Sequence, residues 1–202
     1  MQNNIRVHFP RGVSGSFLIN CIMYYIHPEY FLNLSLDPTG HAHPQKIDLS
    51  DKGRTKIFGT VVFPDNGSHS ATKLDDDFCA VFIKYDRQDY NVIADMFLNK
   101  VLVWQIDTQE YNIMKGADWA NFNEWTTCEF TKQEIKNMWI KNLDLWNNKA
   151  EFLLADHIIS FKDIHFDSTL NERIANITGM PINETVKQYI VDYRNANRIY
   201  WK

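Results

Sequence analysis

Cysteine is scarce in this chain, and its placement excludes two kinds of small domain. The three cysteines, Cys21, Cys79 and Cys128, lie far apart, form no C-x-x-C pair and are odd in number. Disulfide frameworks and structural zinc sites need paired or closely spaced cysteines. We therefore expect buried thiols in a reducing compartment, the cytoplasm, and no metal site.

Long apolar runs and an excess of positive charge are also missing. No stretch reaches the roughly 18 apolar residues that a membrane span needs, and the start MQNNIRVHFP does not have the pattern of a signal peptide. Lys and Arg number 21 against 25 Asp and Glu, for a net charge of −4. We therefore expect no membrane or nucleic-acid partner, so that any anion must be bound at a local site.

Apolar residues are plentiful enough for one sizeable core. The 202 residues are 45% hydrophobic and 14% aromatic, which predicts a single domain over residues 1–202. Residues 5–9 alternate apolar and polar side chains like a strand, and the apolar run 16–26 follows as a buried helix. FCAVFIKY and the segment after it repeat the order of strand, polar turn and helix, which is typical of a mainly parallel α/β sheet.

The C-terminal third is predicted to be mostly helical, with a short strand at 157–161. Thr131 and Glu134 form a capping-box pattern, and Ser168 or Thr169 is expected to cap a helix that ends at Gly179. Asn183 is expected to cap the last helix. On that helix, Arg194 and Arg198 are spaced for one face, which we expect to be a surface; the alternative is a clamp that closes over a bound nucleotide.

The loop between the first strand and helix contains the groups that bind phosphate. Gly12 and Gly15 let a ligand approach the backbone, Ser14 and Ser16 add hydroxyl donors, and Arg11 adds a cation. Unpaired N–H groups at a helix amino end attract anions. The segment is neither a Walker A motif nor a G-x-G-x-x-G motif, so an ordinary turn is the alternative.

FPRGVSGSFL resembles the P-R-S-G-[ST]-[ST]-x-L loop of the sulfotransferase family, with Gly12 and Val13 inserted. In that family, the loop holds the 5′-phosphosulfate of PAPS (3′-phosphoadenosine-5′-phosphosulfate). The resemblance implies that Arg11 faces the phosphosulfate, that Gly15 and Ser16 donate hydrogen bonds to it, and that Phe17 enters the helix.

The tail is similar to the late region of the same family. Phe161, Asp163 and Ile164 match its F-x-D-[IL] element, and Gly179 and Pro181 match the turn before its terminal helix. The middle departs from the family pattern R-[DN]-P-x-[DE]-x-x-x-S, which holds the 3′-phosphate: Tyr85 and Ile93 replace the Arg and the Ser, while Asp86 and Asp89 match. Arg87 is the candidate replacement cation.

Sulfuryl transfer needs a base for the acceptor and a cation for the developing charge. Arg11 is the candidate cation. His69 is the first candidate base, followed by His43 and Asp86, because a histidine near its ordinary pKa accepts a proton at neutral pH. The alternative for His69 is a solvated loop residue.

The resemblance implies a three-layer, P-loop-like α/β fold with a central, mainly parallel sheet flanked by helices. The expected function is transfer of a sulfuryl group from PAPS to a hydroxyl or amine of a small-molecule or glycan acceptor. The alternatives are a nucleotide- or phosphate-binding protein of the same fold and an interaction or structural protein. The oligomeric state is open, with a homodimer as one possibility.

Overall fold

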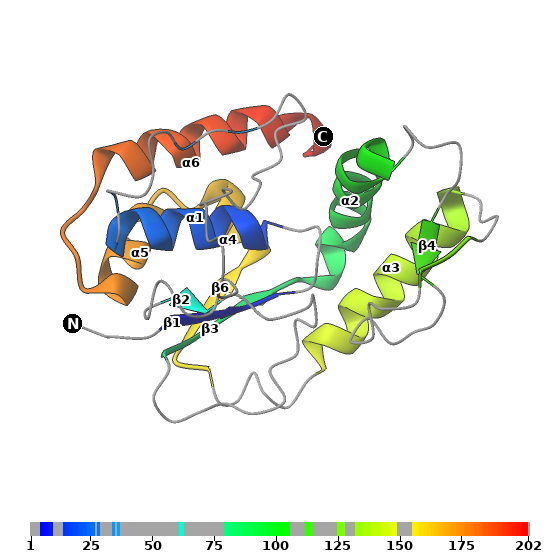
Figure 1. The fold of residues 1–202 in the computed structure, drawn as a ribbon, viewed down its shortest axis with the longest axis horizontal. Coiled ribbons are helices and arrows are strands. Elements are labelled where there is room, and N and C mark those ends of the chain that lie inside the picture. Colours follow the sequence, from blue (N-terminus) through cyan, green and yellow to red (C-terminus); the bar gives the residue numbers. More distant parts are fainter. Residues whose placement is uncertain are drawn as a thin grey trace, which may run out of the picture.

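Secondary structure is described for part of the chain in the computed structural model (Figure 1). The described residues are 5–9, 14–26, 28, 34, 36, 61–62, 79–105, 112–114, 125–127, 132–148 and 155–201. All statements on the structure concern these ranges. Arg11, Gly12, His43, His69 and Thr131 lie outside them.

A parallel sheet forms the centre of the described fold. Its strand order is β2-β1-β3-β6, and every neighbouring pair is parallel. The strands are β1 (Ile5–His8), β2 (Val61–Val62), β3 (Cys79–Lys84) and β6 (His157–Ser160). A separate antiparallel pair joins β4 (Asn112–Met114) to β5 (Trp125–Thr127). The expectation of a mainly parallel sheet is confirmed for the described strands.

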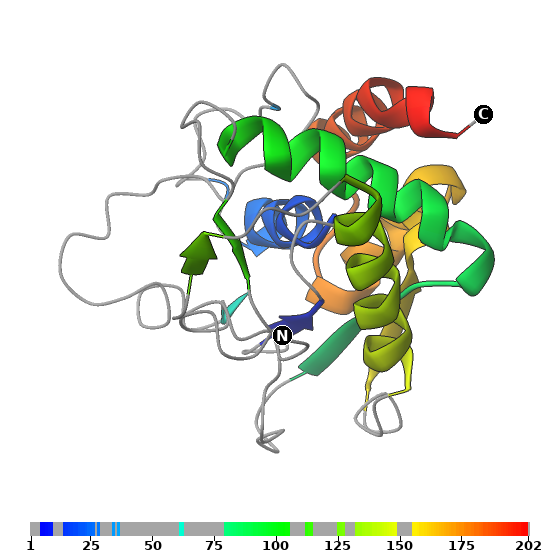
Figure 2. The same ribbon diagram turned by 90° about the vertical axis from the view of Figure 1, so that its right-hand side faces the viewer.

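Helices surround this sheet in two groups (Figures 1 and 2). One contains α1, α4, α5 and α6, which pack on one another, and the other contains α2 and α3. The helices are α1 (Gly15–Ile26), α2 (Tyr90–Gln105), α3 (Lys132–Asn147), α4 (Phe161–Phe166), α5 (Leu170–Thr178) and α6 (Glu184–Asn197), with short 3-10 helices η3 (Arg87–Asp89) and η5 (Arg198–Tyr200). The chain is therefore a mixed α/β protein.

The sheet is held by apolar side chains and by one aromatic stack. The first five residues of β3 are buried, as in strands that are covered on both faces. His8 and Phe82, paired on neighbouring strands, stack at 4.2 Å between ring centroids, and Trp146 of α3 continues the stack at 6.1 Å from Phe82. The Trp146 indole also donates a hydrogen bond of 2.9 Å to the Ile83 carbonyl. Helix α3 is thereby attached to the sheet.

Local signals in the C-terminal third are mostly confirmed. Asn183 caps α6 and accepts hydrogen bonds from the N–H groups of the second and third helical residues at 2.9 and 3.2 Å. Gly179 ends α5 with a left-handed φ of 69°. Thr169, one of the two expected residues, is the N-cap of α5, but its side chain makes no capping bond; its N–H and hydroxyl both donate to Asp167 at 2.8 Å. The expected strand is one residue shorter, since Phe161 begins α4.

The described apolar core is one cluster that joins β1, β3, α1, α4, α5 and α6. Among the described residues, no helix combines the length and the apolar character that a membrane crossing requires.

Candidate functional site

The carboxyl edge between β1 and β3 is the point at which the order of strands changes direction. From β1 the chain continues through α1 to β2 on one side, and from β3 it continues through α2 and α3 to β6 on the other. Open α/β sheets bind ligands at such a switch point, outside the carboxyl ends of the strands. The amino end of α1 and the segment 85–89 both lie at this edge. We therefore take it as the candidate site.

Ser14 precedes the first residue of α1 and has an unusual conformation. Its φ is 56°, in the left-handed region that residues with a side chain seldom adopt. Its carbonyl accepts the first hydrogen bond of the helix, from the Leu18 N–H at 3.0 Å. The buried Ser14 hydroxyl lies 2.7 Å from the hydroxyl of Tyr193 on α6. The serine that the sequence assigns to phosphate is therefore bonded to a tyrosine here.

Gly15 has a packing reason to be glycine. A Cβ at this position would lie 1.8 Å from Cδ2 of the Phe9 ring, much closer than any atom can approach. Phe9 is itself buried at the end of β1. The sequence predicts that Gly15 is glycine so that a ligand can approach the backbone. In the structure, the close packing of Phe9 by itself already requires glycine at this position.

Ser16 and Phe17 differ in what they can offer a ligand. Ser16 is half-buried. Phe17 is fully buried as the third residue of α1, and its ring stacks on Tyr193 at 3.9 Å and on Tyr189 at 5.2 Å. Phe17 enters the helix as expected, and its buried side chain is used in packing against α6.

The segment after β3 is filled with core side chains. Tyr85 is fully buried, its ring lies 5.7 Å from Phe161, and its backbone N–H and carbonyl are both bonded to the Asn147 side chain. Ile93 is also fully buried. These two residues stand where the resembled family has its 3′-phosphate Arg and Ser. Neither side chain is exposed to a ligand.

Arg87, the candidate replacement cation, is bonded to α3. Its Nη2 and Nε lie 2.9 and 3.0 Å from Oδ1 of Asp144. The Arg87 side chain is nevertheless 75% exposed. Surface ion pairs of this kind contribute little stability and exchange partners readily, so a phosphate could compete with Asp144 for the guanidinium.

Asp89, which matches an acidic position of the 3′-phosphate pattern but was not predicted to be a site residue, is a buried carboxyl at the same edge. It is 7% exposed, and its Oδ2 has no hydrogen-bond partner among the described residues. Burial raises the pKa of this carboxyl and the charge of Asp86 raises it further, whereas Lys162 of α4 lowers it. The signal that could have identified it is an acidic residue soon after a buried strand. A carboxyl with a raised pKa is suited to proton transfer.

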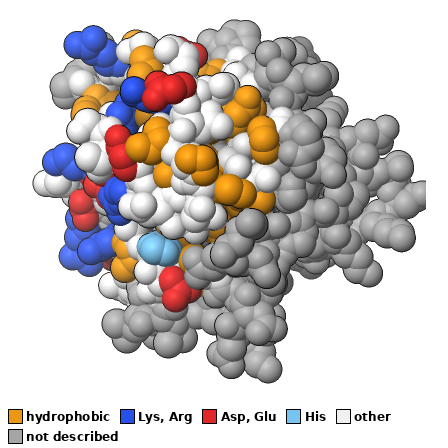
Figure 3. Space-filling view, turned by 90° about the vertical axis from the view of Figure 1, so that its left-hand side faces the viewer, with side chains coloured by type: hydrophobic (Ala, Val, Ile, Leu, Met, Phe, Trp, Pro, Cys, Tyr) orange, Lys and Arg blue, Asp and Glu red, His pale blue; other side chains and the backbone are white. Residues whose placement is uncertain are grey.

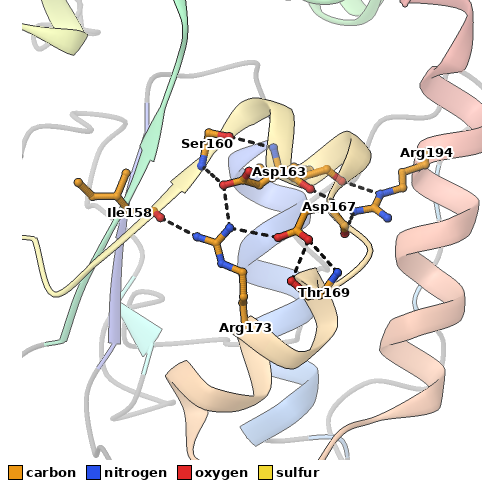
Figure 4. A network of polar contacts seen from close by, with 8 residues as sticks. Ile158, Ser160, Asp163, Asp167, Thr169, Arg173 and Arg194 are labelled. Carbon is orange, nitrogen blue, oxygen red and sulfur yellow. Dashed lines mark hydrogen bonds and ion pairs between the residues drawn. The ribbon is translucent and has the colours of Figure 1, made fainter.

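The F-x-D element is structural in the described fold (Figure 4). Asp163 forms a reciprocal capping box with Ser160: its carboxylate accepts from the Ser160 N–H at 2.9 Å, and its own N–H donates to the Ser160 hydroxyl at 2.9 Å. Arg173 of α5 donates to the same carboxylate at 2.7 Å and to the Ile158 carbonyl at 2.8 Å. Burial raises the Asp163 pKa, but the bonds from Arg173 and Ser160 lower it by more, so the net pKa is below the ordinary value.

Arg194 closes the other end of α4 (Figure 4). Its guanidinium donates to the carbonyls of Ile164, Asp163 and Asp167 at 2.8, 3.1 and 2.7 Å. A cation at the carboxyl end of a helix donates hydrogen bonds to the last carbonyls of that helix and interacts favourably with the negative end of the helix dipole. The prediction that both arginines lie on a surface is confirmed for Arg198, which is exposed. Arg194 is half-buried, and its guanidinium binds backbone carbonyls.

Charges on the face drawn in Figure 3 are mixed. Basic and acidic side chains alternate along one margin, with apolar side chains beside them, and no single-sign block is visible among the described residues. Within the described ranges, no three His, Cys, Asp or Glu side chains come together as a metal site.

The chain matches no protein-family model, no curated protein and no solved structure.

Proposed function

We propose that this protein is a sulfotransferase-like enzyme that moves a sulfuryl group from PAPS to a hydroxyl or amine acceptor. The observation that carries the proposal is the position of the α1 amino end at the switch point of a parallel sheet. Helix amino ends and switch points both favour anionic ligands. The proposed fold is the three-layer, P-loop-like arrangement whose first loop holds the phosphosulfate.

The proposed reaction is an in-line displacement. The acceptor oxygen or nitrogen forms a bond to sulfur while the bond between sulfur and the phosphate oxygen breaks, and the acceptor proton passes to a base. Arg11 neutralises the charge that develops on the leaving oxygen. His69 is the base that the sequence favours. Asp89 is a second candidate because its carboxyl is buried at the carboxyl edge with a raised pKa.

A second candidate function keeps the anion site and changes the ligand. The burial of Tyr85 and Ile93 and the pairing of Arg87 with Asp144 favour a ligand that has no 3′-phosphate. The protein would then bind a nucleotide or another phosphate ester at the α1 amino end without sulfuryl transfer.

Thermal unfolding with different ligands tests both proposals. The ligands are PAP (3′,5′-adenosine bisphosphate), 5′-AMP, ATP and inorganic sulfate, and the proteins are the wild type, Arg11→Ala and Lys187→Ala. Lys187 is an exposed cation on α6 whose ion pair in the described part of the chain is with nearby Glu184, at 3.2 Å, so its variant controls for loss of one charge. A ligand at about 100 times its Kd adds about 2.7 kcal/mol, or roughly 5–11 °C in Tm for a chain of this size.

The outcomes separate the candidates. A PAP shift that Arg11→Ala abolishes and Lys187→Ala keeps supports the PAPS site, and an assay with radiolabelled PAPS then tests transfer. Equal shifts with PAP and 5′-AMP favour the second candidate. No shift with any of the four ligands refutes both and leaves the interaction protein as the better hypothesis.

A further inference from the structure

One hydrogen bond ties the candidate site to the C-terminal helix. The hydroxyls of Ser14 and Tyr193 lie 2.7 Å apart although the residues are 179 positions apart in sequence. Both side chains are buried, with 8% of Ser14 and 2% of Tyr193 exposed. Water is therefore a poor substitute for either partner in this bond.

Ser14, which makes this bond, is also the one described residue other than glycine that has a positive φ. A residue with a Cβ keeps such a conformation only where its surroundings hold it there. The surroundings of Ser14 include the start of α1 on its carboxyl side and the Tyr193 hydroxyl on its side chain. Loss of the hydroxyl removes the side-chain half of this constraint.

Tyr193 is itself held rigidly. Its ring stacks on Phe17 with the centroids 3.9 Å apart and the planes 14° apart, and it is tilted by 37° against the His165 ring, with the centroids 5.5 Å apart. Its hydroxyl is therefore a fixed point against which Ser14 is set.

We infer that Tyr193 is a positioning residue for the anion site: its hydroxyl fixes Ser14, and thereby the direction of the first N–H groups of α1. The inference rests on the proposed function, because it names the residue that shapes the same site. Tyr193 acts through Ser14 and does not touch the ligand. The bond also couples the docking of α6 to the binding competence of the loop.

The chain provides a matched control one helical turn away. Tyr189 also lies on α6, is 2% exposed and stacks on Phe17 at 5.2 Å. Its hydroxyl accepts a weaker bond of 3.4 Å from the Asn20 side chain, within α1 and away from its amino end. Tyr189→Phe therefore removes a buried hydroxyl from the same interface without affecting Ser14.

The test measures Kd for PAP by calorimetry in the wild type, Tyr193→Phe, Ser14→Ala, the double variant and Tyr189→Phe. A net hydrogen bond corresponds to a change of about two- to tenfold. We expect Tyr193→Phe and Ser14→Ala each to raise Kd by that factor, the double variant to be no weaker than the worse single variant, and Tyr189→Phe to stay within twofold of the wild type.

A second readout needs no ligand. The Leu18 amide, which donates to the Ser14 carbonyl, should exchange with solvent several times faster in Tyr193→Phe than in Tyr189→Phe. Unchanged exchange overturns the inference whether or not a ligand binds. Additive losses of affinity in the double variant would also overturn the inference. PAP binding by Tyr193→Phe that equals or exceeds that of the wild type would do the same, since the freed serine would then bind the ligand directly. A wild type that binds neither PAP nor sulfate refutes the proposed function instead.

Discussion

Replacing Gly15 with alanine should destabilise the protein, although the same change in most helices is stabilising. Glycine is worse than alanine in a helix by about 0.5–1 kcal/mol, so helix propensity alone predicts a gain. In this structure the new methyl would lie 1.8, 2.0 and 2.2 Å from Cδ2, Cε2 and Cγ of Phe9. The Phe9 ring is only 6% exposed, so it cannot simply turn into solvent to relieve the overlap.

The magnitude follows from two limits. Forcing extra atoms into a packed core costs about 1–3 kcal/mol, and expelling a buried phenylalanine ring entirely costs about 3–5 kcal/mol. After subtraction of the propensity gain, Gly15→Ala should lose about 1–4 kcal/mol. For a chain of this length, that lowers Tm by roughly 2–16 °C.

Chemical and thermal unfolding followed by circular dichroism would measure the loss. Gly179→Ala is the control: its φ is 69° but, within the described ranges, no heavy atom lies within 4 Å of the added Cβ, so it should cost only the backbone strain of about 1–2 kcal/mol. Combining Gly15→Ala with Phe9→Leu should cost less than the sum of the two single changes, because the smaller side chain relieves the overlap. A Gly15→Ala variant as stable as the wild type would refute the packing argument.

Three further predictions concern charged groups and thiols. Asp163→Asn should lower stability by about 1–2 kcal/mol at pH 7 through the lost cap and ion pair. Because the pKa of Asp163 in the folded state is below the ordinary value, the wild type should lose this advantage as the pH falls below about 4. A Tm series from pH 7 to 3 would detect the loss. Asp89→Asn should instead raise the free energy of unfolding at neutral pH. Because the pKa of Asp89 is raised in the fold, the wild type loses stability as the pH rises through that pKa, so the variant should be as stable as the wild type at pH 3 and more stable at pH 7. A variant that is less stable at neutral pH contradicts the burial argument. Cys79, whose pKa is raised to about 11 by burial and then by Asp156, should not react with a thiol reagent at pH 8 before unfolding, as peptide mapping of the labelled protein would show.

The parts of the fold that were predicted correctly rest on local signals. The apolar runs of β1, β3 and α1, the side chain of Asn183 and the glycine at position 179 each determine structure within a few residues of themselves. At α5 the expected N-cap residue, Thr169, is in place, but its side chain makes no capping bond, and its hydroxyl and N–H donate to the Asp167 carboxylate two residues earlier.

The contacts that shape the candidate site were not predictable in the same way. Ser14 was assigned to phosphate from its place in the loop, and nothing near it in sequence points to Tyr193. The ring of Phe9 against Gly15 depends on the turn between them. Arg194 illustrates the same limit, because its helix spacing indicated a surface while three carbonyls of the α4 region bind its guanidinium.

The all-parallel sheet has a consequence for how the chain folds. Ile5 of β1 pairs with Cys79 of β3, and Val81 of β3 pairs with His157 of β6, so each central strand must wait for a partner that is made much later in synthesis. Non-local pairings of this kind slow folding to milliseconds or seconds. During that delay the apolar edges of β1 and β3 are uncovered and prone to associate with other chains. Recombinant yield should therefore respond strongly to a lower expression temperature and to chaperone supply.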